Sequence, residues 1–502
     1  MFTSRRGGLL AASAGLALII AAAPASAETL AEAIALAYDS NPTLQAQRAT
    51  QRALDENWVQ ARAGYRPTVQ AQAAANYTEN RVPANARAVD RNGDGVPDPV
   101  GSGITEANSA GATLSLSQPL FTGGRVAATV SAAEADILAG REQLRRTEAS
   151  VMQAVIQAYA DVRRDQEGLR IRQENQRVLQ RQLDESKARF EVGEITRTDV
   201  AQSEARLAAA DAQLALAQSQ LASSRATYAA VVGQNPGDLA PEPQLSDLLP
   251  ADISQAFEAA ENNNPQVRQA KYAERASNAR LAGAKAERMP NLGVSASLGY
   301  NGPAEPFERE DYSRAVRAGA TVTVPLFTGG LTSSRIRAAM ERNNTDRINV
   351  EAARRSVMQS LTQAWNQHVA SKSNIVSTDE QVRAARIAAE GTRQEQQVGL
   401  RTTLDVLNAE QELRNAELSQ VSARRDEFVA VSLVLAQMGL LEAPLLTPGV
   451  TRYDASANFK NNRVTWGWVP WEEPIAVVDG VLTPKVTEQP TTAAPPPAPA
   501  SK

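Results

Sequence analysis

Residues 90–98 are the stretch of the chain whose residue types and spacing point most directly to metal chemistry. Asp90, Asn92 and Asp94 place side-chain oxygens at alternate positions before Gly95, which is how a calcium-binding loop begins. Such a loop carries a bidentate glutamate at its twelfth position, where this chain has Gly101. Two interpretations therefore stay open, a calcium site and a polar loop that binds no metal.

The remaining sequence offers little reactive chemistry. The chain has no cysteine, which excludes disulfides and thiolate metal sites, and we expect its one histidine, His368, at the surface of a long helix. It contains no nucleotide-binding loop, nucleophile elbow or metalloprotease motif. We therefore predict no enzymatic activity and no cofactor. The formal net charge of -4 gives no reason to expect nucleic acid as a partner.

The N-terminus has the pattern of an export signal. Arg5 and Arg6 precede an apolar run, and Ala25-Ser26-Ala27 offers a cleavage site. The apolar run is short for a membrane-spanning helix. We predict a signal peptide over residues 1–27 and a mature protein that lies beyond the inner membrane.

Two parts of the sequence repeat at one spacing. Pro-Leu-Phe-Thr-Gly-Gly at residues 119–124 returns 206 residues later at 325–330, and the Val-Gly pairs at 192–193 and 398–399 keep the same offset. The chain is therefore an internal tandem repeat whose halves should fold alike. The predicted organisation is a first repeat over 28–232, a linker over 233–250, a second repeat over 251–441 and a C-terminal periplasmic extension over 442–502 with a Pro-rich disordered tail.

Each half combines two strands with long helices. Apolar and polar residues alternate in predicted hairpins over 66–121 and 290–326, whose strands are long enough to cross a bilayer. Helical patterns follow over 125–191, 199–232, 331–396 and 402–438. The 67 residues of 125–191 would span about 100 Å as a helix. The helix that begins the first repeat and the shorter helix over 199–232 together have about the same length.

Four strands cannot close a barrel, and an open sheet edge cannot face lipid. Other chains must then complete the barrel, with eight strands in a dimer or twelve in a trimer. The helices carry narrow apolar seams typical of coiled coils. The alternatives are the edge of a soluble β-sandwich for the strands and a plain coiled-coil stalk for the helices.

The repeat, the paired Pro-Leu-Phe-Thr-Gly-Gly turns and the Val-Gly loops resemble the TolC family of outer-membrane efflux proteins, over about residues 28–441. The resemblance implies an α+β membrane protein, a homotrimer whose twelve-stranded outer-membrane β-barrel continues into a periplasmic barrel of twelve helices. It also implies a periplasmic adaptor protein, an inner-membrane ABC or proton-driven transporter, and outer-membrane lipid as partners.

The family closes its periplasmic end through the two helix-turn-helix loops. By this resemblance Arg401 would bond to the Thr198-Asp199 pair, while Gln396 stands where the family has a tyrosine. The family also rings its constriction with two aspartates. Here the first is Asp405 and the second is replaced by the neutral Asn408, which halves the ring of acids and should weaken its preference for cations.

The implied function is the exit channel of a tripartite export system, gated at the periplasmic helix tips. Its cargo would be protein, as in type I secretion, or small toxic compounds. The alternative is a trimeric surface adhesin or a coiled-coil stalk without transport activity.

Overall fold

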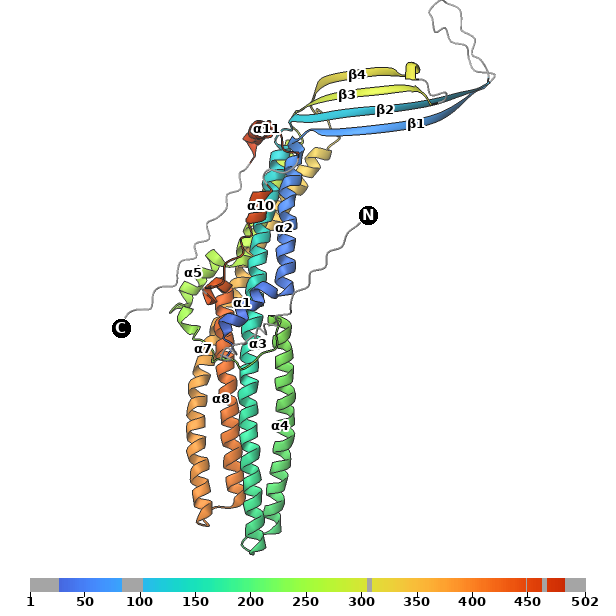
Figure 1. The fold of residues 1–502 in the computed structure, drawn as a ribbon. Helices are drawn as coiled ribbons and strands as arrows, with labels where there is room; N and C mark the ends of the chain where they lie inside the picture. Colours follow the sequence, from blue (N-terminus) through green and yellow to red (C-terminus); the bar gives the residue numbers. More distant parts are fainter. Residues whose placement is uncertain (1–26, 84–102, 305–308, 448, 463–466, 484–502) are drawn as a thin grey trace, which may run out of the picture.

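The computed structural model describes residues 27–83, 103–304, 309–447, 449–462 and 467–483. It is an elongated molecule with a sheet at one end and long helices that run away from it (Figure 1). The predicted signal peptide, the candidate calcium loop at 90–98 and the Pro-rich tail lie outside the described residues. Within the described part of the chain, no helix combines the length and the apolar character needed to cross a membrane.

The sheet has four antiparallel strands in chain order. They are β1 (Thr68–Val82), β2 (Gly103–Phe121), β3 (Asn291–Pro303) and β4 (Ser313–Thr323). The two hairpins therefore join through the pairing of β2 with β3, which brings the two repeats together. Within one chain β1 and β4 are edge strands, so each leaves a row of backbone groups without a strand partner from this sheet.

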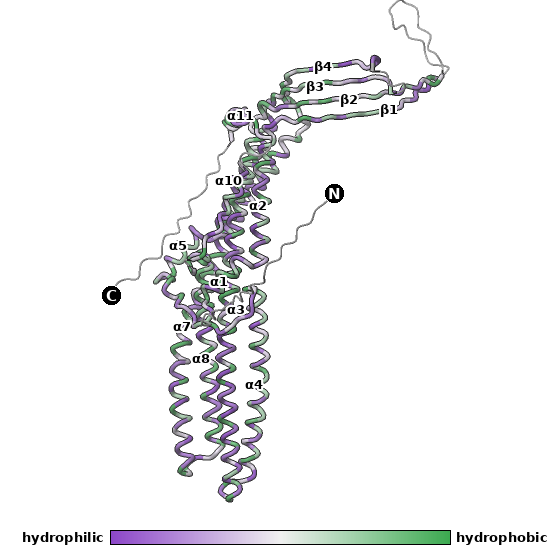
Figure 2. Tube along the Cα trace, in the orientation of Figure 1, coloured by the Kyte–Doolittle hydropathy of each residue, from purple (hydrophilic) through white to green (hydrophobic). Residues whose placement is uncertain are grey.

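The two faces of the sheet differ in polarity. The register aligns Ala71, Leu114, Leu298 and Val316 in one row across the four strands. The neighbouring row is Gln72, Thr113, Gly299 and Ala315, and hydropathy alternates along the strands in Figure 2. On the apolar face Leu114 and Val316 are exposed in the single chain. An apolar face that alternates with a more polar one is what the wall of a membrane-spanning barrel requires.

The helices form two sets related by the repeat. They are α1 (Leu30–Ser40), α2 (Pro42–Arg62), α3 (Arg125–Glu191), α4 (Arg197–Val232), α5 (Ile253–Asn263), α6 (Pro265–Ala286), α7 (Leu331–Gln397) and α8 (Thr403–Gln437). In Figure 1, α2 lies beside the upper half of α3, and α4 lies beside its lower half. The helix α4 begins two residues before the predicted start.

Two asparagines explain why the short helices stack end to end. Asn41 caps α2 with its side-chain oxygen and donates from its amide nitrogen to the carbonyl of Val231 at 2.9 Å. Asn264 caps α6 and donates to the carbonyl of Gln437 at 2.8 Å. Each asparagine therefore starts one helix and bonds the last turn of another, which supplies partners for backbone groups that helix ends leave unpaired.

The largest hydrophobic core of the described residues lies near the middle of the molecule, where α1 and the start of α2 meet the end of α4. Its fully buried side chains include Ile34, Met152, Tyr159, Tyr228 and Leu435. These residues come from α1, α3, α4 and α8, so both repeats share the core.

The prediction of a surface position for His368 is wrong. Its side chain is only 12% exposed, because it packs edge-on to Trp365 and lies 3.8 Å from a carboxylate oxygen of Glu427 on α8. Burial, together with the nearby charge of Lys372, lowers the pKa of His368.

The C-terminal extension returns from the end of α8 toward the sheet. It carries α9 (Ala443–Leu446), α10 (Ala457–Asn461) and α11 (Glu472–Asp479), and the last two lie along the upper helices in Figure 1. The Asp479 carboxylate accepts hydrogen bonds from the backbone nitrogens of Thr122 and Gly124 at 2.7 and 3.0 Å. It also accepts from the Thr122 hydroxyl at 2.8 Å. Asp479 thus caps the first turn of α3 from 355 residues away.

Candidate functional site

The tips of the two helical hairpins lie at the end of the molecule farthest from the sheet (Figure 1). Gly193 closes the turn between α3 and α4 with a φ of 81°, and Gly399 closes the turn between α7 and α8 with a φ of 80°. Each glycine donates from its backbone nitrogen to a carbonyl three residues earlier, at 3.0 Å. The left-handed conformation explains why glycine stands at both positions. The repeat therefore extends to the backbone of the tips.

Each tip restarts its second helix with a capping box. The Asp199 carboxylate accepts from the Thr196 backbone nitrogen at 3.0 Å and from the Thr196 hydroxyl at 2.8 Å. Asp405 repeats both contacts with Thr402 at 3.0 and 2.8 Å. The hydrogen bonds from Thr402 lower the pKa of Asp405 below that of an ordinary aspartate. The two predicted acids are thus held at equivalent places, one on each tip.

Arg401 pairs within its own hairpin in the single chain. Its Nε lies 2.9 Å from a carboxylate oxygen of Glu395, and both side chains are about half exposed. Thr198 is exposed on the other tip, and the Asp199 carboxylate is engaged by Thr196. The predicted bond between Arg401 and the Thr198-Asp199 pair therefore stays a proposal for assembled chains.

A different bond joins the two hairpins of one chain. The guanidinium of Arg206 on α4 donates to the side-chain oxygen of Asn408 on α8 at 2.9 Å. Sequence reasoning missed Arg206, although its position seven residues after Asp199 places it on the same face of α4. The sequence analysis predicted Asn408 only as a neutral replacement for an aspartate. In the structure it accepts a hydrogen bond from Arg206, and an aspartate at this position could accept the same bond.

Two polar side chains near the second tip are buried, although most charged residues around it are exposed. Gln396, predicted to replace a tyrosine, is buried, and its backbone carbonyl accepts the bond that closes the turn. Glu410, on α8 five residues after Asp405, is also buried and pairs with Arg393 and Arg414. Arg393 belongs to α7, so its pair with Glu410 holds α7 and α8 together near the tip, whereas Arg414 supports Glu410 from within α8.

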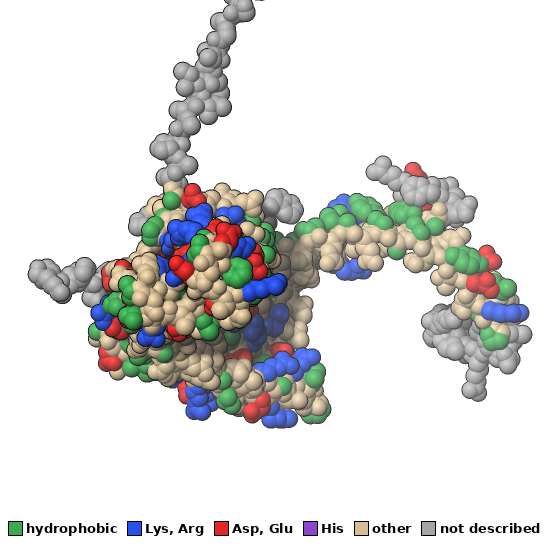
Figure 3. Space-filling view, turned by 90° about the horizontal axis from the view of Figure 1, so that it is seen from below, with side chains coloured by type: hydrophobic (Ala, Val, Ile, Leu, Met, Phe, Trp, Pro, Cys, Tyr) green, Lys and Arg blue, Asp and Glu red, His purple; other side chains and the backbone are tan. Residues whose placement is uncertain are grey.

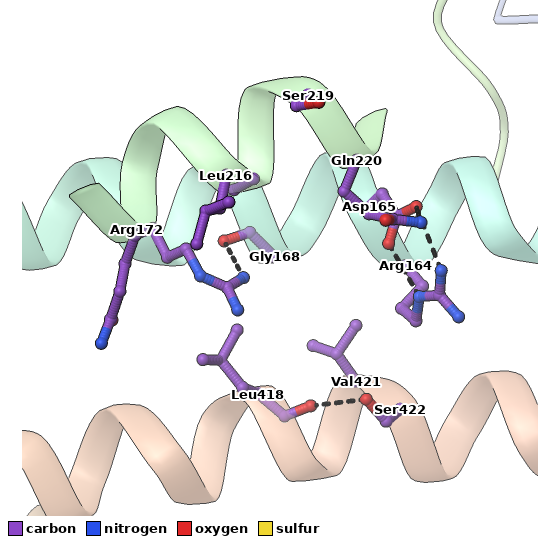
Figure 4. Close-up of a pocket in the computed structure, with 12 residues that line it drawn as sticks. Arg164, Asp165, Gly168, Arg172, Leu216, Ser219, Gln220, Leu418, Val421 and Ser422 are labelled. Carbon is purple, nitrogen blue, oxygen red and sulfur yellow. Dashed lines mark hydrogen bonds and ion pairs between the residues drawn. The ribbon is translucent and has the colours of Figure 1, made fainter. Parts of the chain in front are cut away.

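A groove runs between the two hairpins above the tips (Figure 4). Its volume is about 390 Å³, and α3, α4 and α8 each contribute to its walls. Its lining mixes small residues, among them Gly168, Ala217 and Ser422, with larger polar and apolar side chains. At its upper end Asp165 accepts hydrogen bonds from Arg164 at 2.8 Å and from Ser224. Small side chains of this kind let another helix approach closely.

The tip end of the molecule carries charges of both signs. Seen from below, basic and acidic side chains lie side by side over the ends of the helices (Figure 3). Among the described residues, no cluster of three or more histidine, aspartate or glutamate side chains could hold a metal ion. The contacts that these tips do make are charged hydrogen bonds, such as those of Arg206 with Asn408 and of Arg401 with Glu395.

Comparisons with known proteins agree with this architecture. A family model described as Outer membrane efflux protein matches residues 33–234 and 256–431. The chain is 32% identical over 443 residues to the outer membrane efflux protein BepC of Brucella suis, covering 88% of this chain and 92% of BepC. It is 26% identical over 335 residues to the alkaline protease secretion protein AprF of Pseudomonas aeruginosa, covering 66% of this chain and 69% of AprF.

The fold also matches solved structures. The Campylobacter jejuni CmeC outer membrane channel superimposes with a TM-score of 0.70 at 15% sequence identity, covering 86% of this chain and 88% of that one. The fold class predicted from the sequence, that of trimeric TolC-like outer-membrane channels, is confirmed. The chain belongs to the outer membrane efflux protein family that its repeated motifs indicated, and it is an outer-membrane export channel whose long helices extend into the periplasm.

Proposed function

We propose that three copies of this chain form the exit channel of a tripartite export system, gated at the tips of the helical hairpins. An inner-membrane transporter would supply the energy, and a periplasmic adaptor would connect the two. Family membership disfavours the alternative of an adhesin or a stalk without transport.

The observation that carries the gating proposal is the bond between Arg206 and Asn408. It ties the two hairpins of one chain together close to the capping acid Asp405. A single charge-assisted hydrogen bond contributes about 1.5–3 kcal/mol, and solvent exposure reduces this value. Such a bond can keep the tips closed at rest and can still be broken when a partner binds.

Arg401 and Asp405 would act between chains. Arg401 is exposed and within reach of solvent, so it can exchange Glu395 for the Thr198-Asp199 pair of a neighbouring copy. Three copies of Asp405 would place three carboxylates around the mouth, and Asn408 would add none. A ring of this kind favours cations, but less strongly than a ring with twice as many acids.

The groove between the hairpins supports the adaptor as a partner. A helix of the adaptor that lies over Gly168, Ala217 and Ser422 would contact α3, α4 and α8 together. Binding there could separate the hairpins and weaken the bond between Arg206 and Asn408. The relatives include an efflux protein and a protease secretion protein, which supports either small toxic compounds or unfolded protein as cargo.

Single-channel recording of the purified mature protein in a planar bilayer tests the gate. We expect small, steady, cation-preferring currents from the unaltered protein. Arg206→Ala and Arg401→Ala should each raise the conductance several-fold, because each removes a bond that holds the tips together. Asp405→Asn should lower the preference for cations.

Arg181→Ala is the matched control, since Arg181 is an exposed arginine on α3 that lies away from the tip turn. It should leave conductance and selectivity unchanged. A conductance in Arg206→Ala and Arg401→Ala that equals that of Arg181→Ala would refute the gate at the tips, even if the protein still conducts.

A further inference from the structure

The helix α11 turns two of its three charged residues, Glu472 and Asp479, toward the protein and its valines outward. The third, Glu473, is 60% exposed and pairs with Arg62. Glu472 and Asp479 are seven residues apart and therefore share one face of the helix. Glu472 is fully buried, with carboxylate oxygens 2.6 Å from Arg62 Nε and 2.9 Å from Arg66 Nε. Asp479 is buried against the first turn of α3. Strong polar contacts therefore fix the orientation of this helix.

The outward side of the same segment is apolar. Val477, Val478 and Val481 are 71%, 58% and 77% exposed, and Trp468 and Trp471 next to the helix are also exposed. A helix on a water-facing surface has the opposite arrangement, with its apolar side chains against the protein. An exposed apolar patch of this kind marks a surface that contacts lipid or another protein.

This patch lies at the level where the strands begin. In Figure 1, α11 stands beside the upper end of α3, next to the start of the sheet. The Trp471 indole nitrogen donates to the side-chain oxygen of Gln118 at 3.1 Å. Gln118 stands opposite Val294 in the pairing of β2 with β3, on the face that carries Leu114 and Leu298. The patch therefore adjoins the apolar face of the sheet at the end where the strands meet the helices.

We propose that residues 467–483 form an interfacial anchor that rests in the periplasmic leaflet of the outer membrane. Valine side chains would enter the boundary between headgroups and acyl chains, and the tryptophans would lie at headgroup level, where their apolar rings and N–H groups are both accommodated. The segment contains no lysine or arginine, so its binding depends on apolar burial and not on anionic lipid. In the trimer, three such anchors would surround the base of the barrel.

Depth-dependent quenching tests this contact, and the absence of cysteine from the chain makes the labelling clean. Val477→Cys and Val481→Cys would each be labelled with a small fluorophore and reconstituted as the full mature protein in phosphatidylcholine vesicles. Some of the lipids would carry a nitroxide near the headgroup end of an acyl chain. Val316→Cys, on the apolar face of the sheet, is the positive control, and Val398→Cys, at the exposed tip, is the negative control.

We expect labels at 477 and 481 to be quenched several-fold more than the label at 398 and to approach the label at 316. Quenching at 477 and 481 that equals that at 398 would overturn the anchor. The same cysteines can carry a photo-crosslinker, which distinguishes lipid from a second copy of the chain. A crosslinked chain dimer from position 477 would show that a neighbouring copy covers the patch, and this result would also refute the lipid contact.

Discussion

The two Pro-Leu-Phe-Thr-Gly-Gly turns have the same sequence and similar backbones but different surroundings. In the first, Thr122 is buried, Asp479 caps the following helix, and a Cβ on Gly123 would lie 2.4 Å from the Cβ of Met289. In the second, Leu326 and Phe327 are 93% and 90% exposed, and nothing lies within 4 Å of a Cβ built on Gly329. The motif therefore encodes the turn but not the contacts around it.

The position of each turn in the chain accounts for the difference. The first turn belongs to the first repeat, but the pairing of β2 with β3 brings the second repeat against it, so that Met289 covers it. The second lies at the edge of the chain, beside β4, where no later repeat follows. Ahead of the hairpins the two repeats are offset by 223 residues, the spacing between Asn41 and Asn264, because the first hairpin is 17 residues longer than the second. Arg66 and Pro67 are therefore the counterparts of Met289 and Pro290. Those two residues on a neighbouring copy are the expected cover for the second turn.

A second pair of positions shows the same asymmetry nearer the middle of the molecule. In the first repeat the hydroxyl of Tyr38 donates to buried Glu148 at 3.4 Å. The counterparts of these two residues in the second repeat are Glu261 and Arg354, which form a half-exposed ion pair at 2.9 Å. One contact thus uses a buried neutral donor, and its equivalent uses two charges in contact with water.

Phe327→Ser should have the largest effect, because it tests whether a second copy covers the exposed turn. Burial of an aromatic side chain of this size stabilises an interface by about 2 kcal/mol, so the three equal interfaces of the trimer would together lose about 6 kcal/mol of association free energy. We expect the trimer to dissociate in detergent, measured by light scattering after size-exclusion chromatography. Phe190→Ser, which alters an exposed aromatic at the opposite end of α3, should leave the trimer intact. Equal loss in both variants would contradict the proposed cover.

Glu472→Ala should release α11 and the rest of the C-terminal extension from the Pro-Leu-Phe-Thr-Gly-Gly turn at residues 119–124. The trimer should stay intact. The substitution leaves Arg62 and Arg66 buried without their shared carboxylate, and breaking a buried pair in this way costs about 3–5 kcal/mol. The measurement is the rate of limited proteolysis within residues 449–483. Glu473→Ala is the control, since its side chain is 60% exposed and its pair with Arg62 should contribute at most about 1 kcal/mol. A resistant Glu472→Ala protein would show that other contacts hold the extension.

Glu148→Gln should have the smallest effect and one that depends on pH. Burial, together with the charge of Glu442, raises the pKa of Glu148. The stability that this group contributes is therefore complete below the ordinary glutamate pKa and is lost as pH rises through the raised value in the folded protein. The variant should raise the melting temperature at about pH 7 and change it little at about pH 4. Glu261→Gln, at the exposed counterpart, should show no such gain, and a gain at both positions would contradict burial as the cause.

The sequence was sufficient for the strands and helices of the two repeats because each of these elements follows from a local pattern. The helices α9, α10 and α11 of the C-terminal extension were not predicted. Alternation located the strands, the period of the helices and their length located α3 and α7, and the Asn-Pro pairs located the breaks that Asn41 and Asn264 now cap. The tip glycines and acids were found because the same residues occur at equivalent positions in both repeats. These are all short-range features, which a single sequence can report.

Long-range contacts could not be predicted in the same way. Nothing near Asp479 in the sequence points to Thr122, and nothing near Arg206 points to Asn408. His368 was misplaced for the same reason, because its burial depends on how α7 packs against α8. The inverted polarity of α11 also needs three dimensions, since only the position of Arg62 and Arg66 shows which side of that helix faces inward.

The cap that Asp479 places on α3 has a consequence for the order in which the molecule is completed. The bonded residues lie 352 to 357 positions apart, and Asp479 is among the last described residues to be synthesised and exported. A chain that ends before residue 472 would contain every strand and every long helix, yet the first turn of α3 would lack its cap, and Arg62 and Arg66 would lack their buried partner. The first repeat therefore reaches its full set of contacts only once residues 472–479 are in place, so its stability depends on residues more than 350 positions away.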